Sequence, residues 1–346
     1  MTAPVTIVGG GVAGLSLAWA LTKRGRRVDV WEAGTVGGGA SAVATSYMEP
    51  RLGRTPARRL EWEAVARWPL FATEVEATSG MAVGFRPDGQ LRFAFADTEA
   101  DVRADLGVRR EGGWDADWVD GPAVRAAVPD ISDAVTGAAL VRGPAWCDGP
   151  ALCRALAEAV RRRDGTIREG ATFTGREAVP GPLVVANGPG AEALRDALPA
   201  LPAVRLTKGT TLLYRCDVAL PHMLRSRDVS IVPRDGALVV GSSRERGATG
   251  LEPDPDVVRD LHARAVRVLP ALAHVAPEPR CGWRTLVGDG SLNLGCTEDR
   301  QVFWSLSHAG VGYLRAPLVA AEMASWIDGG ALALCAPFAR AVSSRS

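Results

Sequence analysis

The chain has few of the residues that build metal sites. Only four of its 346 residues are histidine, and its six cysteines include no C-x-x-C pair. Structural and catalytic zinc sites usually place such cysteines and histidines at short, regular spacings. The sequence therefore indicates no metal site, and scattered cysteines of this kind are typical of small buried side chains in a reducing compartment.

Neither sign of charge is in excess, and no apolar run is long enough to cross a bilayer. The chain has 40 Lys+Arg against 39 Asp+Glu, a formal net charge of +1. This balance argues against a nucleic-acid groove or a polybasic membrane patch. No charged leader precedes the first apolar run. We expect a cytoplasmic protein with a small-molecule partner, and the sequence leaves homo-oligomerisation open.

Glycine is abundant, and three glycines near the start of the chain have G-x-G-x-x-G spacing. Gly9, Gly11 and Gly14 follow the apolar run 5–8 and open a helical pattern that stops at Gly25. In such a unit the first glycine permits a sharp turn, the second lets a pyrophosphate approach the backbone, and the third lets helix and strand pack closely. The free N–H groups and the helix dipole then face the phosphates.

A second apolar run, 28–31, ends at Glu32, at the offset expected for an acid that binds the adenosine ribose. Together these runs predict a strand, turn, helix and second strand that bind a dinucleotide. The glycine cluster 37–39 and the N-terminal position of the motif favour permanently held FAD over NAD. The small residues of 37–50 are consistent with a flexible loop or with a second flavin contact, with Ser41 on a phosphate and Tyr47 and Met48 beside the isoalloxazine.

Later segments alternate between helical and antiparallel patterns, and the length suits two domains. Amphipathic helices are predicted over 56–79 with a break at Pro69, over 150–163, over 255–269 and at the C-terminus through Ile327. Hairpins are predicted around Asp88-Gly89 within 84–95 and around Asp235-Gly236 within 229–243. The run 183–186 is typical of a buried parallel strand that returns to the first sheet.

With these features in order, the chain resembles the D-amino-acid-oxidase-like flavoproteins, and most of all the glycine oxidases of thiamine biosynthesis. The motifs that carry the resemblance are the glycine fingerprint, GGGAS, RWPLFATEVEATSG, RPDGQL, VDGPAVRAAVPDISDAVTGAAL, IVPRDGALVVGSS and HAGVGYLRAP. The resemblance implies a mixed α/β fold in which a Rossmann-type FAD-binding domain (1–80, 142–200 and 281–346) is interleaved with an antiparallel substrate-binding domain (81–141 and 201–280).

The resemblance also implies where FAD binds. Pyrophosphate and ribose contacts fall on the fingerprint glycines and Glu32, and flavin-side contacts fall on 40–48 and on the turn 310–314. The candidate cofactor-binding residues are Gly9, Gly11, Val12, Ala13, Gly14, Glu32, Ala33, Gly39, Ala40, Ser41, Ser46, Met48, Phe173, Ala186, Asn187, Gly188, Gly282, Gly310, Val311, Gly312, Tyr313 and Leu314. Relatives with covalent flavin carry a cysteine soon after the arginine that matches Arg284. This chain has Leu286-Val287-Gly288 there, so we expect noncovalent FAD.

The family's substrate-binding arginine corresponds to Arg284, in the context Gly282-Trp283-Arg284. A guanidinium is well suited to bind a carboxylate through two hydrogen bonds. Tyr47 and Tyr313 are candidates for pocket walls or hydrogen bonding. His308 is a candidate partner of the flavin pyrimidine edge or else a structural histidine. Lys208 could place a cation near the flavin, although a solvent-exposed lysine is the simpler interpretation.

Three departures from the family pattern bear on the substrate. Thr285 replaces a proline, Ser230 stands where glycine oxidases place a tyrosine, and Ala309-Gly310 stand where they place tyrosine and arginine. Two polar groups that would face a small substrate are therefore absent from the sequence.

The resemblance implies oxidation of a small amine or amino acid, such as glycine, sarcosine or a D-amino acid. Hydride would pass to flavin N5, leaving an imine, and oxygen would be reduced to hydrogen peroxide. An alternative is a dehydrogenase or oxidase of a larger amine-bearing intermediate or modified nucleoside. The full-length substrate-domain pattern argues against a non-enzymatic flavin- or NAD-binding module. The C-terminal glycine turn that returns to the nucleotide sheet argues against an NAD-dependent dehydrogenase.

Overall fold

Two β-sheets organise the chain, which the computed structural model describes over residues 3–175, 177–308 and 310–343. The first sheet has seven strands, and all its neighbours are parallel except β15 and β16. Its strands, in spatial order, are β17 (Ala339–Val342), β15 (Asn293–Thr297), β16 (Val302–Leu306), β9 (Leu183–Val185), β1 (Val5–Val8), β2 (Val28–Trp31) and β8 (Thr166–Arg168).

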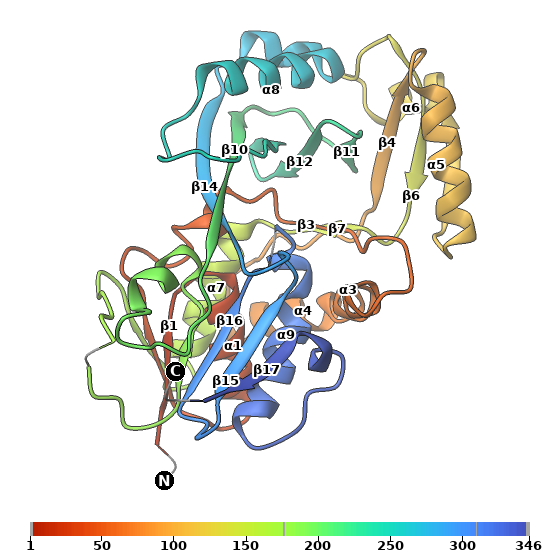
Figure 1. Cartoon of the computed structure of the whole chain (residues 1–346). Helices are drawn as coiled ribbons and strands as arrows, with labels where there is room; N and C mark the ends of the chain where they lie inside the picture. Colours follow the sequence, from red (N-terminus) through yellow and green to blue (C-terminus); the bar gives the residue numbers. More distant parts are fainter. Residues whose placement is uncertain (1–2, 176, 309, 344–346) are drawn as a thin grey trace.

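The second sheet has eight strands and is antiparallel except where β11 meets β4. Its strands, in spatial order, are β14 (Glu278–Leu286), β10 (Arg205–Arg215), β13 (Ala237–Gly241), β12 (Ser230–Arg234), β11 (Met223–Arg225), β4 (Gln90–Phe95), β6 (Val135–Val141) and β5 (Ala116–Asp120). Figure 1 shows this sheet above the first, with the two-stranded ribbon β3 (Tyr47–Met48) and β7 (Ala145–Trp146) between them.

Helices cover both sheets, and three of them begin at an aspartate that accepts a hydrogen bond from the first turn. They are α1 (Val12–Lys23), α2 (Ala40–Val43), α3 (Pro56–Ala66), α4 (Trp68–Ser79), α5 (Glu99–Glu111), α6 (Gly121–Ala127), α7 (Gly149–Arg161), α8 (Pro255–Val268) and α9 (Gly312–Ile327), with 3-10 turns at Gly188–Leu194, Pro270–His274 and Ala336–Phe338. None of the helices in the described ranges combines the length and apolarity that a bilayer span requires.

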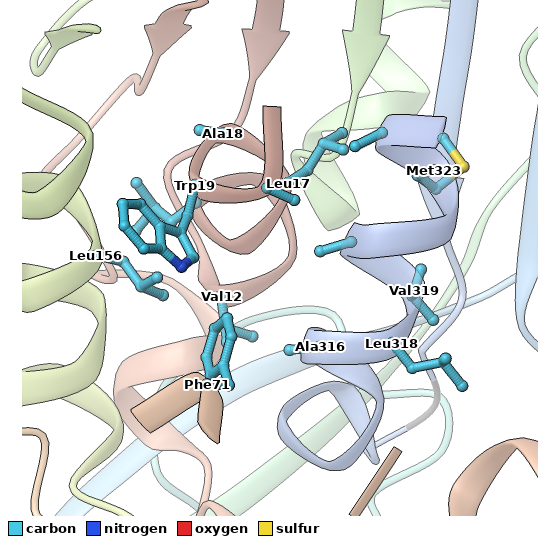
Figure 2. Close-up of a cluster of buried hydrophobic side chains, with 14 of the residues drawn as sticks. Val12, Leu17, Ala18, Trp19, Phe71, Leu156, Ala316, Leu318, Val319 and Met323 are labelled. Carbon is cyan, nitrogen blue, oxygen red and sulfur yellow. The ribbon is translucent and has the colours of Figure 1, made fainter. Parts of the chain in front are cut away.

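The largest core lies where α1 packs between α7 and α9. Ten of the twelve residues of α1 are buried, because the helix has neighbours on nearly every side. Figure 2 shows Trp19 beside Leu156 of α7, while Leu17 faces Met323 of α9. This packing fixes the N-terminal end of α1 relative to the start of α9.

The predicted fold class is confirmed, and so are most of the local predictions. Strands 5–8 and 28–31 pair in parallel, and the strand 183–185 lies on the other side of the first one. The predicted helix break occurs at Arg67, two residues before Pro69, which lies in the first turn of α4. The Asp235-Gly236 turn joins the paired strands β12 and β13 as predicted.

The hairpin predicted around Asp88-Gly89 is wrong. Gly89 has the expected positive φ of 78°, but its N–H donates to the carbonyl of Pro144 (3.0 Å) and not across a hairpin. The following strand, β4, pairs instead with β6 and β11. The turn chemistry was identified correctly, but the partner strands come from distant parts of the sequence.

The expected domain boundary at residue 281 falls inside a strand. β14 pairs with β10 from Glu278 to Leu286, so this whole strand belongs to the eight-stranded sheet. The proposed FAD-binding segments therefore rejoin the seven-stranded sheet only after β14 ends.

A buried ion-pair network ties α3 to α9. The carboxylate of Glu61 is fully buried, and it accepts hydrogen bonds from Arg315 (Nη2 to Oε1, 2.8 Å) and from Arg51. Burial raises the pKa of Glu61, but the hydrogen bonds and charges of these two arginines outweigh it, so the pKa of this group lies below its ordinary value. Arg315 is itself only 3% exposed and depends on Glu61 for charge compensation.

We expect Glu61→Gln to lower the free energy of unfolding by about 3 kcal/mol, because it leaves the Arg315 charge buried and unpaired. Because the native pKa of Glu61 is lowered, its contribution is complete above the unfolded pKa of roughly 4.3 and is lost as the pH falls through the native value. The difference between wild type and variant in urea denaturation should therefore be largest near pH 7 and should shrink below about pH 4.5. Glu63→Gln, an exposed position on the same helix, should change stability by less than about 0.5 kcal/mol, and equal effects of both variants would contradict the assignment.

Candidate functional site

The site begins at the turn between β1 and α1, where glycine is required for steric reasons. Gly9 has φ of 113°, and a Cβ there would lie 2.7 Å from the backbone of Ala186 and Asn187. A Cβ on Gly14 would overlap the carbonyl oxygen of Gly9. Helix α1 starts at Val12, and its N-cap residue, Gly11, has no side chain that could bond to the first turn. The N-terminal end of the helix therefore presents backbone N–H groups and the positive end of the helix dipole.

Glu32 lies one residue beyond β2 and is half-buried beside this turn. Its Oε2 accepts from the N–H of Gly10 and its Oε1 from the N–H of Gly34, both at 2.8 Å. Each carboxylate oxygen retains a lone pair, so the group can still accept hydrogen bonds from ribose hydroxyls. Ala33 beside it is exposed.

A second loop, 33–46, lies against the α1 terminus. The Oγ of Ser41 accepts from the N–H of Val12 (3.0 Å), and Gly37 donates to the carbonyl of Gly10 (2.8 Å). Gly39 and Ala40 are exposed, whereas Ser46 is buried and its hydroxyl donates to the carbonyl of Cys147 (2.9 Å). The exposed small residues of this loop leave the backbone open to a ligand.

We expect Ser41→Ala to weaken FAD binding about fivefold. The Ser41 hydroxyl accepts from the Val12 N–H and keeps its proton to donate to a phosphate, and loss of one such hydrogen bond is worth about 1 kcal/mol. Titration of the apoprotein with FAD, followed by flavin fluorescence, measures this. Thr73→Ala is a suitable control, because that exposed hydroxyl bonds only within α4 (to Pro69, 3.0 Å). An unchanged dissociation constant for Ser41→Ala would contradict the proposed position of this serine.

The other residues expected to contact FAD near the start of α1 lie in two segments of the chain. Phe173 packs edge-on against Trp31 (ring centroids 5.5 Å apart), and the N–H of Ala171 donates to the carbonyl of Glu32 (2.9 Å). Ala186 donates to the carbonyl of Val8 (2.8 Å) at the end of β9. Asn187 follows, and its Oδ1 is buried with no hydrogen-bond partner within the described ranges, so it is available to a ligand.

The C-terminal turn 310–314 closes the site. Gly312 lies next to Val12 of α1, and Gly310 lies beside the side chain of Arg284. Val311 donates to the carbonyl of His308 (3.0 Å), and the carbonyl of Leu314 accepts from Trp68 (3.3 Å). Ala309 lies outside the described residues, so its departure from the family pattern has no structural account.

Two tyrosines expected at the pocket have different environments. Tyr313 is 4% exposed, and its hydroxyl donates to the carbonyl of Ser41 (2.8 Å), so it joins the two loops and does not line a substrate pocket. Tyr47 is half-buried, and the guanidinium of Arg225 lies over its ring at 4.4 Å from the centroid. Met48 also differs from expectation, because its side chain is fully buried in the core.

His308 lies four residues before α9, beside Gly312. Its Nε2 is 3.1 Å from the hydroxyl of Ser305, and its Nδ1 has no partner in the part of the chain that the structure describes. Burial, and then the charge of Arg315, lower the pKa of His308 to about 4. The imidazole is therefore neutral near pH 7 and can either accept from or donate to a neighbouring group.

Arg284 projects from β14 toward Gly310. Its Nη1 donates to the carbonyl of Ser243 (2.9 Å) and its Nη2 to the hydroxyl of Ser242 (2.8 Å). No carboxylate within the described ranges forms an ion pair with this half-buried guanidinium. Burial, and then the charge of Arg244, lower the pKa of Arg284, although the group stays protonated near neutral pH.

Lys208 is not solvent-exposed, contrary to the simpler interpretation of the sequence. It is 6% exposed, and its Nζ lies 2.9 Å from Oε2 of Glu245. Thr285 is buried as well and lies beside Gly188.

The structure thus brings Arg284, Gly310 and the α1 terminus into one region, joined by the loop that contains Ser41. Sequence reasoning missed Ser242, Ser243 and Arg225. For the two serines, the available signal was the cluster of serines and charges that follows β13.

Comparisons with known proteins agree with this geometry. The family model "FAD dependent oxidoreductase" matches residues 4–326. Similar proteins include glycine oxidases of Geobacillus kaustophilus (27% identical, covering 94% of this chain and 92% of that protein) and Bacillus licheniformis (24%, 93% and 92%). A crystal structure of the Geobacillus kaustophilus glycine oxidase superimposes with a TM-score of 0.86 at 25% identity, over 97% of this chain and 98% of that one.

The chain therefore belongs to the FAD-dependent oxidoreductase family, and it is a flavoenzyme of the same fold as the glycine oxidases. The resemblance predicted from the motifs is confirmed. The residues present fit FAD: the N-terminal end of α1 for the pyrophosphate, Glu32 for the ribose, and the Asn187 Oδ1, which has no partner among the described residues. Cys296, the nearest thiol after Arg284, is 2% exposed in the core and its pKa is raised by burial, which agrees with noncovalent FAD.

Proposed function

We propose that this protein is an FAD-dependent oxidase of a small amine or amino acid. The observation that carries the proposal is the half-buried guanidinium of Arg284, whose acceptors among the described residues are all uncharged and which lies beside the 310–314 turn. An arginine in this setting is suited to bind the carboxylate of an amino acid. The similarity to glycine oxidases supports glycine, sarcosine or a D-amino acid as the substrate.

The residues of the site have positioning roles in this proposal. Arg284 holds the carboxylate and thereby directs the α-C–H toward the flavin face, and Ser242 and Ser243 hold Arg284. The neutral His308 lies near the 310–314 turn. Bound FAD supplies the chemistry by accepting a hydride from the α-carbon and passing both electrons to oxygen, which yields hydrogen peroxide and an imine. The amine must be neutral for this transfer.

A second candidate is a dehydrogenase or oxidase of a larger amine, such as a biosynthetic intermediate or a modified nucleoside. It is favoured by Ser230, which is 7% exposed and whose hydroxyl donates to the carbonyl of Gly241 (2.9 Å). This serine offers no polar group to a small substrate.

The test is an absorbance spectrum of the purified protein followed by an anaerobic screen of amines for flavin bleaching. We expect a yellow protein that glycine, sarcosine or a D-amino acid bleaches, with peroxide formed when air is admitted. Bleaching only by larger amines, or without peroxide, would favour the second candidate. Cytoplasmic location, oxygen as acceptor and homo-oligomerisation stay predictions.

A further inference from the structure

Part of the loop that is expected to contact the flavin is held by the second sheet. Arg234, the last residue of β12, donates from Nη2 to the carbonyl of Ala44 (2.7 Å) and to the hydroxyl of Ser46 (3.2 Å). Both acceptors lie in the segment 43–46, which belongs to the chain between β2 and β3. One guanidinium of the antiparallel sheet therefore holds this loop at two points.

Other strands of the same sheet also hold the segment. The hydroxyl of Thr211, in β10, donates to the carbonyl of Val43 (2.9 Å). A Cβ on Gly241 would come 2.9 Å from the methyl group of Thr45, and a Cβ on Gly282 would come 3.3 Å from Val43. The absence of side chains at these two glycines lets the segment approach the backbone of β13 and β14.

Ser46 has a backbone conformation that needs support. Its φ of 53° lies in the left-handed region, which residues with a Cβ rarely adopt. The Ser46 hydroxyl accepts from Arg234 and donates to the carbonyl of Cys147 (2.9 Å), so it is fixed from two sides. At the other end of the loop, the Ser41 hydroxyl accepts from the N–H of Val12 at the start of α1. The loop is thus anchored to α1 at one end and to the second sheet at the other.

The same sheet carries the arginine proposed to bind the substrate carboxylate. Arg284 lies opposite Thr207 in the pairing of β14 with β10, and Thr211 follows Thr207 by four positions. Directly paired residues, and residues an even number of positions apart on one strand, point to the same face of a sheet. Arg284 and Thr211 therefore share a face, and the sheet fixes the distance between the proposed substrate anchor and the segment 43–46.

We propose that Arg234 is a positioning residue for hydride transfer, because through Ala44 and Ser46 it sets the place of the flavin ring relative to Arg284. This inference rests on the proposed oxidation of an amine and on the expected contact between the flavin and residues 40–48. Arg234 itself binds neither the substrate nor the reacting atoms. Its contacts matter because a displacement of about 1 Å between reacting groups can lower a rate about a hundredfold.

Anaerobic flavin reduction by glycine, sarcosine and D-alanine tests this inference on the FAD-loaded protein. In Arg234→Gln we expect the limiting rate of reduction at saturating amine to fall about thirtyfold or more, because the ring is displaced. The amine concentration that gives half of this rate should stay within about threefold of wild type, because Arg284 is unchanged. An unchanged limiting rate, or a change confined to the half-saturating concentration, would overturn the proposal.

Arg125→Gln is the matched control for loss of a guanidinium from this sheet. Arg125 is half-buried like Arg234, and its Nη1 also donates to a backbone carbonyl, that of Val135 in β6 (3.0 Å). Strands β11 and β4 separate β6 from β12. This variant should keep both constants within about twofold of wild type, and a loss of rate equal to that of Arg234→Gln would overturn the proposal.

Thr211→Val is a milder second variant, which removes only the hydroxyl that bonds to Val43. It should keep a normal flavin content and lower the limiting rate about threefold, as expected for the loss of one hydrogen bond. If Arg234→Gln does not fold, Thr211→Val decides the question, and a wild-type limiting rate would overturn the proposal.

A measurement without any amine separates this inference from the proposed function. The visible circular dichroism of a bound flavin depends on how the ring is placed in its asymmetric surroundings. We expect Arg234→Gln to change this spectrum and Arg125→Gln to leave it as in wild type. If no amine bleaches the wild-type flavin, the oxidase function fails and the spectrum still decides whether Arg234 places the ring; a wild-type spectrum in Arg234→Gln would overturn the inference.

Discussion

Replacing Arg284 by glutamine is expected to raise the KM for an amino acid substrate at least a hundredfold. A charge-assisted, hydrogen-bonded pair between this guanidinium and a carboxylate is worth roughly 3 kcal/mol, and each 1.4 kcal/mol is tenfold in affinity. Misplacement of the α-carbon should lower kcat as well, since the orientation of the C–H depends on the same contact. Steady-state peroxide formation gives both constants.

The control for this prediction is Arg280→Gln on the same strand. Arg280 is partly exposed and pairs with Glu278 at 3.3 Å, outside the proposed site, so its KM should stay within twofold of wild type. The flavin spectrum of Arg284→Gln should be close to normal, because the variant breaks no ion pair between described residues. An unchanged KM would remove Arg284 from substrate binding.

Replacing Gly14 by alanine is expected to abolish stable FAD binding. The added Cβ would overlap the carbonyl oxygen of Gly9, a backbone atom at the turn itself, so relief requires α1 to move away from β1. Such a shift displaces the N–H groups that face the pyrophosphate. We expect less than about a tenth of the wild-type flavin per chain after purification, which corresponds to a loss of at least hundredfold in affinity.

Gly107→Ala is the matched substitution. Gly107 lies within α5, and a Cβ there would meet no atom within 4 Å. Alanine is favoured over glycine inside a helix by about 1 kcal/mol, so this variant should retain its flavin and be slightly more stable. Normal flavin content in Gly14→Ala would show that FAD binding does not require the close contact between the turn and the helix.

The nucleotide-binding end of the site could be predicted from the sequence because its determinants are local. Gly9, Gly14 and Glu32 lie within one βαβ unit, and the spacing alone indicates their geometry. Arg284 was predicted from a short motif shared with the family. The surroundings of Arg284 could not be predicted in this way. Ser242, Ser243 and Glu245 come near it only because β10 pairs with β13 and β14.

The remaining errors have the same cause. Lys208 was interpreted as solvent-exposed because nothing near it in sequence indicates Glu245 as a partner. The Asp88-Gly89 turn does not form a hairpin, because β4 pairs with β6 and β11, which lie about 45 residues or more further along the chain. Tyr313 was expected in a pocket wall or in a hydrogen bond, and the acceptor that its hydroxyl finds lies 272 positions earlier in the chain. Pairing between distant segments determines each of these, and single-sequence patterns report mainly local geometry.

The packing of α1 against α9 also has a consequence for biosynthesis. The first helix leaves the ribosome about 300 residues before the last one, a delay of roughly 15–60 s at ordinary elongation rates. Until then the glycine turn lacks the neighbours that fix it, among them Gly312 and the Tyr313 hydroxyl. Nascent chains that lack α9 should therefore be colourless, and flavin capture should follow synthesis of this helix.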